Sequence, residues 1–221
     1  ANPVPTRGGA NLTLDFGVGP MDQHALAARK DVLAFATDPL DEPFEITGHV
    51  EVKLYVSSDA PDTDFTAKLL DIYPDGREML MLDGIQRVKF RNGFENSDPL
   101  PTSQVGEITI DLWSISLVFN KGHRIGVHIS SSNYPRFEVN PNTGADFPPA
   151  GFTPTVEKPV LPGSEQAKAP GETSDDSAAV QKQPYDPAAV RIANNTVYMD
   201  KAHPSALIVQ SRPKAGVVPT R

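Results

Sequence analysis

The 221-residue sequence contains no cysteine, which excludes disulfide bonds, zinc–thiolate sites and thiol nucleophiles. It has no apolar run near the roughly 20 residues that a membrane-spanning helix needs. Lysines and arginines never cluster beyond a dipeptide and the formal charge is -8, so nucleic acid and anionic membranes are disfavoured as partners. The opening ANPVPTRGGANL lacks the charged and apolar regions of a signal peptide. The compartment stays open: cytoplasm, periplasm and secretion all fit.

Alternation of apolar and polar residues dominates the middle of the chain. It runs through 46–56, 107–113 and 124–132, and this period of two predicts strands with one buried face and one wet face. Further strand candidates are DVLAFAT, DFTAKLLDIY, EMLMLDGIQRVKFR, SISLVF, NTVYMD and SALIVQ, separated by turn signals such as Pro74-Asp75-Gly76 and Asn120-Lys121-Gly122. Nine short strands without a convincing helix predict an all-β, jelly-roll-like antiparallel β-sandwich, with a barrel as the alternative.

The composition divides the chain into three parts. Residues 1–30 form an N-terminal segment, and residues 31–144 and 191–212 hold the strand candidates. Residues 145–190 contain eight of the 22 prolines and few aromatics, so they offer too little apolar surface to offset the entropy of ordering. We interpret 145–190 as a long proline-rich loop insertion, partly mobile, placed before the last two strands.

The stretch SSDAPDTDFTAKLLDIYPDG, residues 57–76, is rich in aspartate and raises the question of a site. As a calcium loop starting at Asp59, it would need glycine at position six and glutamate at position twelve, but it has Asp64 and Leu70. Asp62 and Asp64 could serve as an acid–base pair only with a geometry that sequence does not give. We favour a structural role, in which the aspartates shape the link between two strands and Asp64 binds backbone or an arginine.

Other catalytic and metal patterns are weak. No G-x-S-x-G elbow occurs, and no series of βα units could support one. The five histidines form no H-x-H or H-x-x-x-H pair, so a zinc site has little support. We expect His49 and His128 on the polar faces of strands, and His123 and His203 in turns, to be solvated or hydrogen-bonded. The residues alone predict a non-enzymatic β-sandwich without cofactor or metal.

Several long motifs, in order, carry a family resemblance. EITGHVEVKLYVSSDAPDTDFTAKLLDIYPDGREMLMLDGIQRVKFR and DLWSISLVFNKGHRIGVHISSSNYPRFEVNPNTG resemble the C-terminal non-catalytic domain of the X-Pro dipeptidyl-peptidase, cocaine esterase and α-amino-acid ester hydrolase family. ANPVPTRGG, GPMDQHALAARKDVLAFATDPL and NNTVYMDKAHPSALIV resemble the same domain. Only 145–190 falls outside the resemblance.

The resemblance implies a supporting role. In the family, the nucleophile, acid and histidine lie in an α/β-hydrolase domain that precedes this one, so the chain is expected to be inactive alone and to pack on that domain. In the family, the first loop of this domain leans over the active site, which makes Leu12 and Thr13 the candidate substrate-contacting residues; for Leu12, ordinary domain-interface packing is the favoured interpretation. A homo-oligomer is a second expected partnership.

A carbohydrate-binding jelly-roll module is the alternative function, because jelly rolls often serve as lectins. Such a module needs exposed aromatic rings on one face. Only Trp113, Tyr55 and Tyr134 are plausible, and three coplanar rings on a concave sheet would favour this function over the hydrolase relation.

Overall fold

The computed structural model describes residues 3–10, 17–144 and 191–211, and the remaining residues, including Leu12, Thr13 and the 145–190 segment, lie outside the described ranges. The elements in chain order are α1 (His24–Ala27), β1 (Leu33–Ala36), β2 (Phe44–Ser58), β3 (Asp64–Ile72), β4 (Glu78–Arg87), the 3-10 helix η2 (Val88–Phe90), β5 (Gly106–Phe119), β6 (Arg124–Ser130), β7 (Asn195–Tyr198) and β8 (Ala206–Ser211). No helix in these ranges has the length and apolarity to cross a membrane.

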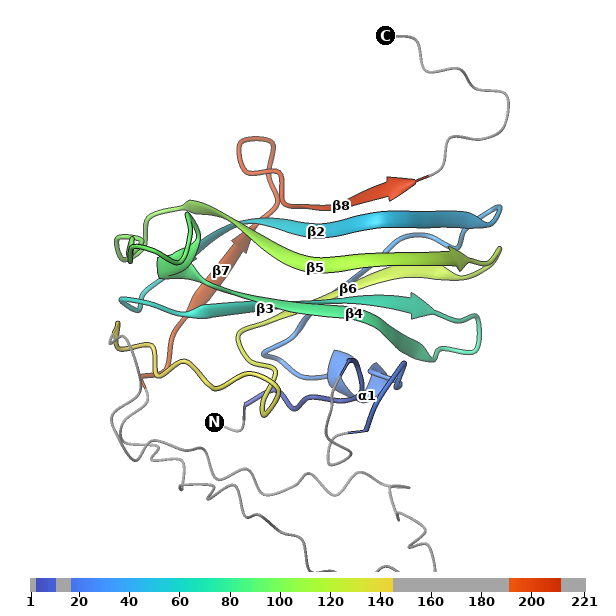
Figure 1. The fold of residues 1–221 in the computed structure, drawn as a ribbon, viewed down its shortest axis with the longest axis horizontal. Helices are drawn as coiled ribbons and strands as arrows, with labels where there is room; N and C mark the ends of the chain where they lie inside the picture. The colour runs from blue at the N-terminus through green and yellow to red at the C-terminus, as the bar shows by residue number, and fades with distance from the viewer. Residues whose placement is uncertain (1–2, 11–16, 145–190, 212–221) are drawn as a thin grey trace, which may run out of the picture.

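The strands form two antiparallel sheets stacked as a sandwich (Figure 1). One sheet has the order β1-β6-β3-β4; in the other, β5 and β7 flank β2, and β8 shares with β7 one edge of β2. All pairings are antiparallel. The predicted all-β antiparallel sandwich is therefore confirmed.

The core lies between the sheets and follows the alternation in the sequence. Val50, Val52 and Leu54 of β2 are buried, and they belong to one cluster with Phe65 of β3 and Ile129 of β6. Side chains on successive residues of a strand point to opposite faces. The 46–56 alternation thus gives β2 one core-facing row of aliphatic side chains.

Strand β5 differs from the sequence-based expectation, because the runs 107–113 and 114–119 form one strand rather than two. The register on β2 shifts between His49 and Glu51, so that Val50 lies opposite both Leu112 and Trp113. The buried positions of β5 are even-numbered up to Leu112, and its partly buried or buried positions are odd-numbered from 115 to 119. This β-bulge changes the phase of the alternation, which is why one strand has the sequence pattern of two.

The two sheets approach each other closely where Gly84 of β4 lies against β5. A Cβ built at Gly84 would lie 2.2 Å from the backbone oxygen of Asp111. A glycine in a strand interior commonly marks such a close approach of another backbone.

The described part of the N-terminal segment lies on the outer side of the β1-β6-β3-β4 sheet (Figure 1). Residues 21–23 run along the start of β4, with hydrogen bonds from Gln23 N to Glu78 O and from Leu80 N to Met21 O. Val4 is buried in a small cluster with Leu26 and Val32. The expectation of a wet face on the 124–132 strand is wrong, since this cover leaves His128 only 4% exposed.

Candidate functional site

Asp62 and Asp64, at the β2–β3 link, are buried and hydrogen-bonded, whereas Asp59 of the same link is not buried. Asp64 accepts two hydrogen bonds from the guanidinium of Arg87, at 2.8 and 3.1 Å, and one from Asn140 Nδ2 at 2.8 Å. Asp62 accepts hydrogen bonds from Lys89 N at 3.1 Å and from Asn140 Nδ2 at 3.0 Å. The structure confirms that Asp64 binds an arginine, and the pair joins β3, the end of β4 and the 131–144 loop.

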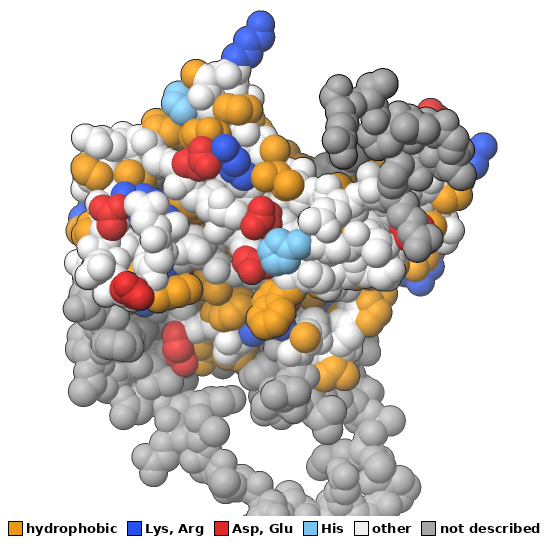
Figure 2. Space-filling model, turned by 45° about the horizontal axis from the view of Figure 1, so that its top comes forward, with side chains coloured by type: hydrophobic (Ala, Val, Ile, Leu, Met, Phe, Trp, Pro, Cys, Tyr) orange, Lys and Arg blue, Asp and Glu red, His pale blue; other side chains and the backbone are white. Residues whose placement is uncertain are grey.

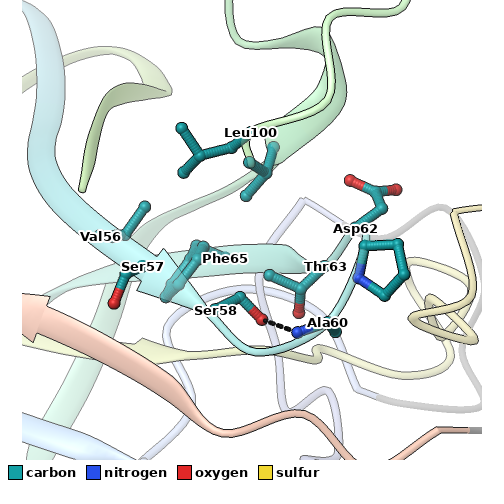
Figure 3. A pocket seen from close by; sticks show the side chains of 10 residues that line it. Val56, Ser57, Ser58, Ala60, Asp62, Thr63, Phe65 and Leu100 are labelled. Atoms are coloured by element: carbon teal, nitrogen blue, oxygen red, sulfur yellow. Dashed lines mark hydrogen bonds between the residues drawn. The ribbon is translucent and has the colours of Figure 1, made fainter. Parts of the chain in front are cut away.

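This cluster offers no room for a substrate. Burial raises the pKa of the Asp64 carboxyl, and its hydrogen bonds with Arg87 and Asn140 oppose that rise. The adjoining cavity, lined by Ser58, Thr63 and Leu100 among others (Figure 3), measures about 10 Å³, which is about the space of one water molecule. Ser58 Oγ accepts a hydrogen bond from Ala60 N inside the turn. The link is therefore a structural joint.

A serine, a histidine and an aspartate do meet elsewhere, on the outer face of the β5-β2-β8 side. Ser114 Oγ lies 3.5 Å from His49 Nδ1, and His49 Nε2 lies 3.2 Å from Asp111 Oδ1. In a hydrolytic triad Nε2 faces the serine and Nδ1 the acid, so this ring is reversed. His49 and Asp111 are also well exposed, with no water-excluding pocket around them among those found in the described residues. The trio is a surface hydrogen-bonded cluster.

A group of buried and partly buried polar and charged side chains lies under the N-terminal segment. This N-terminal network consists of Gln23, Lys68, Glu78, Asp83, His128, Asn133 and Arg136. Lys68 Nζ on β3 donates to Gln23 Oε1 at 2.9 Å, and Gln23 Nε2 donates to the backbone oxygens of Arg7 and Met21. One buried glutamine thus connects the sheet to the segment above it.

The rest of the network pairs charges of opposite sign. Asp83 on β4 accepts from Asn133 Nδ2 at 2.9 Å and lies 3.2 Å from Arg136 Nη1. His128 Nε2 on β6 lies 3.0 Å from Glu78 Oε2. Thr6 Oγ1 donates to Asn133 O and accepts from Arg136 N, which ties the first residues of the chain to the same group.

Burial shifts the pKa values of Lys68, Asp83 and His128 in the direction that favours their neutral forms. It lowers the pKa of Lys68 to about 8, although the Asp83 charge opposes the change. Burial likewise raises the pKa of Asp83 against the effect of Arg136 and lowers that of His128 against the effect of Glu78. Desolvation disfavours the charged form of each group. The sequence analysis does not predict this network. The one feature of the sequence that hints at it is the presence of charged residues at alternate positions of strands that are buried.

The network supports the base of the loop that carries the expected substrate-contacting residues. Gly9 and Gly19 exchange two backbone hydrogen bonds, of 2.8 and 2.9 Å, and close the loop between them. A Cβ built on Gly9 would lie 3.1 Å from Arg136 Nη1 and 3.3 Å from Asp83 Oδ1. The positive φ of Gly9 also favours glycine. Leu12 and Thr13 belong to this loop, beyond the described residues.

Two open grooves border the sandwich. A cleft of about 620 Å³ lies beside the N-terminal segment and includes Val4, Leu33, Ser132 and Asn195. A groove of about 280 Å³ opens between β1 and β8 and is mostly apolar. Within residues 3–10, 17–144 and 191–211, no three His, Cys, Asp or Glu side chains are grouped to hold a metal ion.

The three aromatic residues expected of a carbohydrate module are not grouped in one place. Tyr134 is buried beside the N-terminal segment, where its backbone pairs with Val4 and Thr6. Trp113 is exposed on β5, and Tyr55 on β2 lies opposite Glu107, six residues from Trp113 along β5. Tyr55 also packs edge-on against His203. This arrangement provides no common stacking surface for a sugar.

A comparison with known proteins matches most of the chain. A family model for the X-Pro dipeptidyl-peptidase C-terminal non-catalytic domain matches residues 4–208. The chain belongs to this family. The cocaine esterase of Rhodococcus sp. (strain MB1 Bresler) is 46% identical over 144 residues, which are 65% of this chain and 25% of the esterase.

Solved structures of the same kind match over more of the chain. An aminopeptidase from a marine-sediment Thaumarchaeota archaeon covers 96% of it, with 26% identity and a TM-score of 0.70. An α-amino acid ester hydrolase covers 87% with 26% identity and a TM-score of 0.67. The matches span 25% to 32% of these three longer chains. This member of the family is a non-catalytic C-terminal domain of serine hydrolases of the cocaine esterase and amino acid ester hydrolase type, as the sequence motifs indicated.

Proposed function

We propose that this domain packs through its N-terminal segment on an α/β-hydrolase domain of the same longer protein and helps to shape that domain's active site. One observation carries the proposal: the loop between Gly9 and Gly19 is closed by two backbone hydrogen bonds, and Gly9 at its base lies close against the ion pair of Asp83 and Arg136. An anchored loop base restricts where the loop can reach, as a residue that positions substrate requires. Leu12 and Thr13, on this loop, are the proposed contacts to the substrate.

The substrate class follows from the names of the relatives. They are an esterase, an amino acid ester hydrolase and an aminopeptidase, and all of these activities transfer an acyl group to water. We therefore assign the longer protein to acyl transfer from an ester or an amide, with a serine nucleophile on the hydrolase domain. We also propose that the strands are connected as in a jelly roll and that residues 145–190 are an inserted loop. Self-association of the protein is proposed as well.

The cleft beside the N-terminal segment is the second support for an interdomain face. Ser132 Oγ and Asn195 Oδ1, both from residues that line it, are buried without a hydrogen-bond partner in the described chain. Buried polar atoms generally find a partner. A neighbouring domain placed against this cleft would supply one if the side chains that cover these atoms moved aside.

The test uses the full-length protein that contains this chain, with a p-nitrophenyl ester as substrate. Replacing Leu12 and Thr13 with alanine should raise KM several-fold while the urea midpoint of unfolding stays unchanged. Val18→Ala is the matched control, because Val18 is 51% exposed at the other end of the loop. Unaltered kinetics in the double variant would exclude substrate contact by this loop.

A second experiment tests the division of labour. The purified 221-residue chain should hydrolyse neither p-nitrophenyl acetate nor an X-Pro-anilide faster than a heat-treated sample, because the described residues provide no activated nucleophile in a pocket. If the chain hydrolysed either substrate and the Ser114→Ala variant did not, the non-catalytic assignment would be wrong. The Ser114–His49–Asp111 trio would then have a catalytic role.

A further inference from the structure

The outer face of the β5-β2-β8 side carries one large exposed aromatic residue in an acidic setting. Trp113 is 73% exposed, and Asp111 and Glu51 lie directly opposite each other on β5 and β2. His49 contacts both carboxylates, at 3.2 and 3.7 Å. We call these four residues the Trp113 patch. Figure 2 shows a histidine with acidic and hydrophobic side chains beside it in the open on this face.

Two features of the Trp113 patch cost stability. Trp113 has a φ of 72°, a left-handed conformation that is unfavourable for a bulky side chain. Asp111 and Glu51 are like charges on directly opposite residues, which is also unfavourable. Asp111 supports the bulge by accepting a hydrogen bond of 2.6 Å from Trp113 N. Local departures of this kind cluster at functional sites.

No lysine or arginine of the described ranges neutralises this acidic pair. His49 is the sole ion-pairing partner of Glu51 and Asp111 there. By contrast Glu107, on the same face, pairs with Lys53 at 2.8 Å. The patch therefore combines an open indole face with unneutralised carboxylates. A cation that lies on the indole and bonds the carboxylates is complementary to both.

We infer that the Trp113 patch is a docking surface for an arginine side chain presented by a separate partner protein. Arginine fits better than lysine, because its planar guanidinium stacks on aromatic rings and bonds carboxylates in a bidentate manner. The patch and the N-terminal segment lie on opposite sides of the sandwich (Figure 1). The hydrolase domain proposed above would occupy the N-terminal side, which leaves this face open to another protein.

The single tryptophan of the chain makes the test specific, because intrinsic tryptophan emission reports on Trp113 alone. The full 221-residue chain is titrated with the peptide acetyl-Gly-Arg-Gly-Arg-Gly-amide. Matched peptides carry lysine, or neutral citrulline, in place of arginine. The arginine peptide should change the emission saturably, the lysine peptide should bind several-fold more weakly, and the citrulline peptide should give no response.

Variants separate the patch from general acidity. Glu51→Gln with Asp111→Asn should weaken binding about tenfold, the loss expected for roughly 1.4 kcal/mol of charge-assisted contact. Asp41→Asn with Glu95→Gln removes the same charge from exposed positions elsewhere and should leave binding within about twofold. Calorimetry with Trp113→Phe should show weaker binding of the same peptide.

Three results would overturn the inference. If the two double variants lost the same amount of affinity, the binding would be explained by the overall net charge of -8 and not by the patch. An emission change with glucose or cellobiose, but none with the arginine peptide, would make the patch a sugar platform. An emission change that follows protein concentration without peptide would identify a second copy of the chain as the occupant. Each outcome is independent of the hydrolase test, which concerns the opposite side of the sandwich.

Discussion

Lys68 should make the stability of the domain depend on pH in a window where few other groups titrate. Its pKa is about 8 in the folded chain, against 10.5 for an unburied lysine, chiefly because burial penalises the ammonium. Between these two values the unfolded chain holds the proton and the folded chain does not. Because the unfolded state then binds more protons, stability rises with pH from about 8 to about 10.5.

The size of the effect follows from the two pKa values. Each pH unit between them corresponds to about 1.4 kcal/mol, so the charged lysine costs about 3 kcal/mol when the pH is well below 8. Raising the pH from about 7 to about 9.5 should recover about 2 kcal/mol of this penalty. Burial also raises the pKa of the Tyr134 phenol, and its contribution to the pH dependence cancels when two variants that both keep Tyr134 are compared.

The measurement is urea unfolding of the wild type and of Lys68→Met across that pH range. The free-energy difference between the two proteins should change by about 2 kcal/mol in favour of the wild type as the pH rises. Lys53→Met is the control, since Lys53 is exposed and its hydrogen bond with Glu107 raises its pKa, so its curve should run parallel to that of the wild type. If the difference in the free energy of unfolding between the wild type and Lys68→Met stayed constant with pH, the conclusion that burial lowers the pKa of Lys68 would be wrong.

Three further substitutions test other parts of the fold, each by its urea midpoint. Asp64→Ala should lower the free energy of unfolding by about 3 kcal/mol, because it leaves the guanidinium of Arg87 without its acceptor; an unchanged midpoint would contradict the structural joint. Gly84→Ala should cost about 1–3 kcal/mol by forcing the sheets apart at Asp111, and a neutral result would mean that the backbones separate freely. Trp113→Gly should stabilise by about 1 kcal/mol, because glycine tolerates the positive φ; destabilisation would show that the indole packs.

The strands that the sequence predicts correctly are those in which apolar and polar residues alternate without interruption. Strand β2 keeps its buried residues at even positions from Ile46 to Val56, so its pattern indicates both the strand and its core face. Strand β5 changes phase at Trp113, where a bulge adds one residue against Val50. Sequence periodicity assumes a constant phase. The sequence pattern therefore predicts two strands where the structure has the single strand β5, and the break falls where the backbone departs from regular geometry.

The outer cover of the β1-β6-β3-β4 sheet was not predictable for a different reason. Polar residues at alternate positions, such as Lys68 and His128, indicate a wet face if the face meets water. Here Gln23 and Arg136 come from segments 45 and 68 residues away in sequence from Lys68, and their contacts turn the same pattern into a buried network. The role of Asp64 was simpler to foresee, because an acid at a turn has few alternatives to backbone and arginine partners.

The chemistry of the N-terminal network explains why it contributes more to the positioning of the N-terminal segment than to the stability of the fold. Aliphatic side chains of similar volume are often neutral or stabilising replacements for buried charges, and Lys68 carries a penalty below pH 8. Hydrogen bonds, unlike aliphatic contacts, have direction. Gln23 therefore fixes the height and the register of the N-terminal segment over β3 and β4, where an apolar side chain would allow it to slide. The loop that we propose to reach a neighbouring domain would need such a fixed base, and the two Gly9–Gly19 hydrogen bonds close that base beside Asp83 and Arg136.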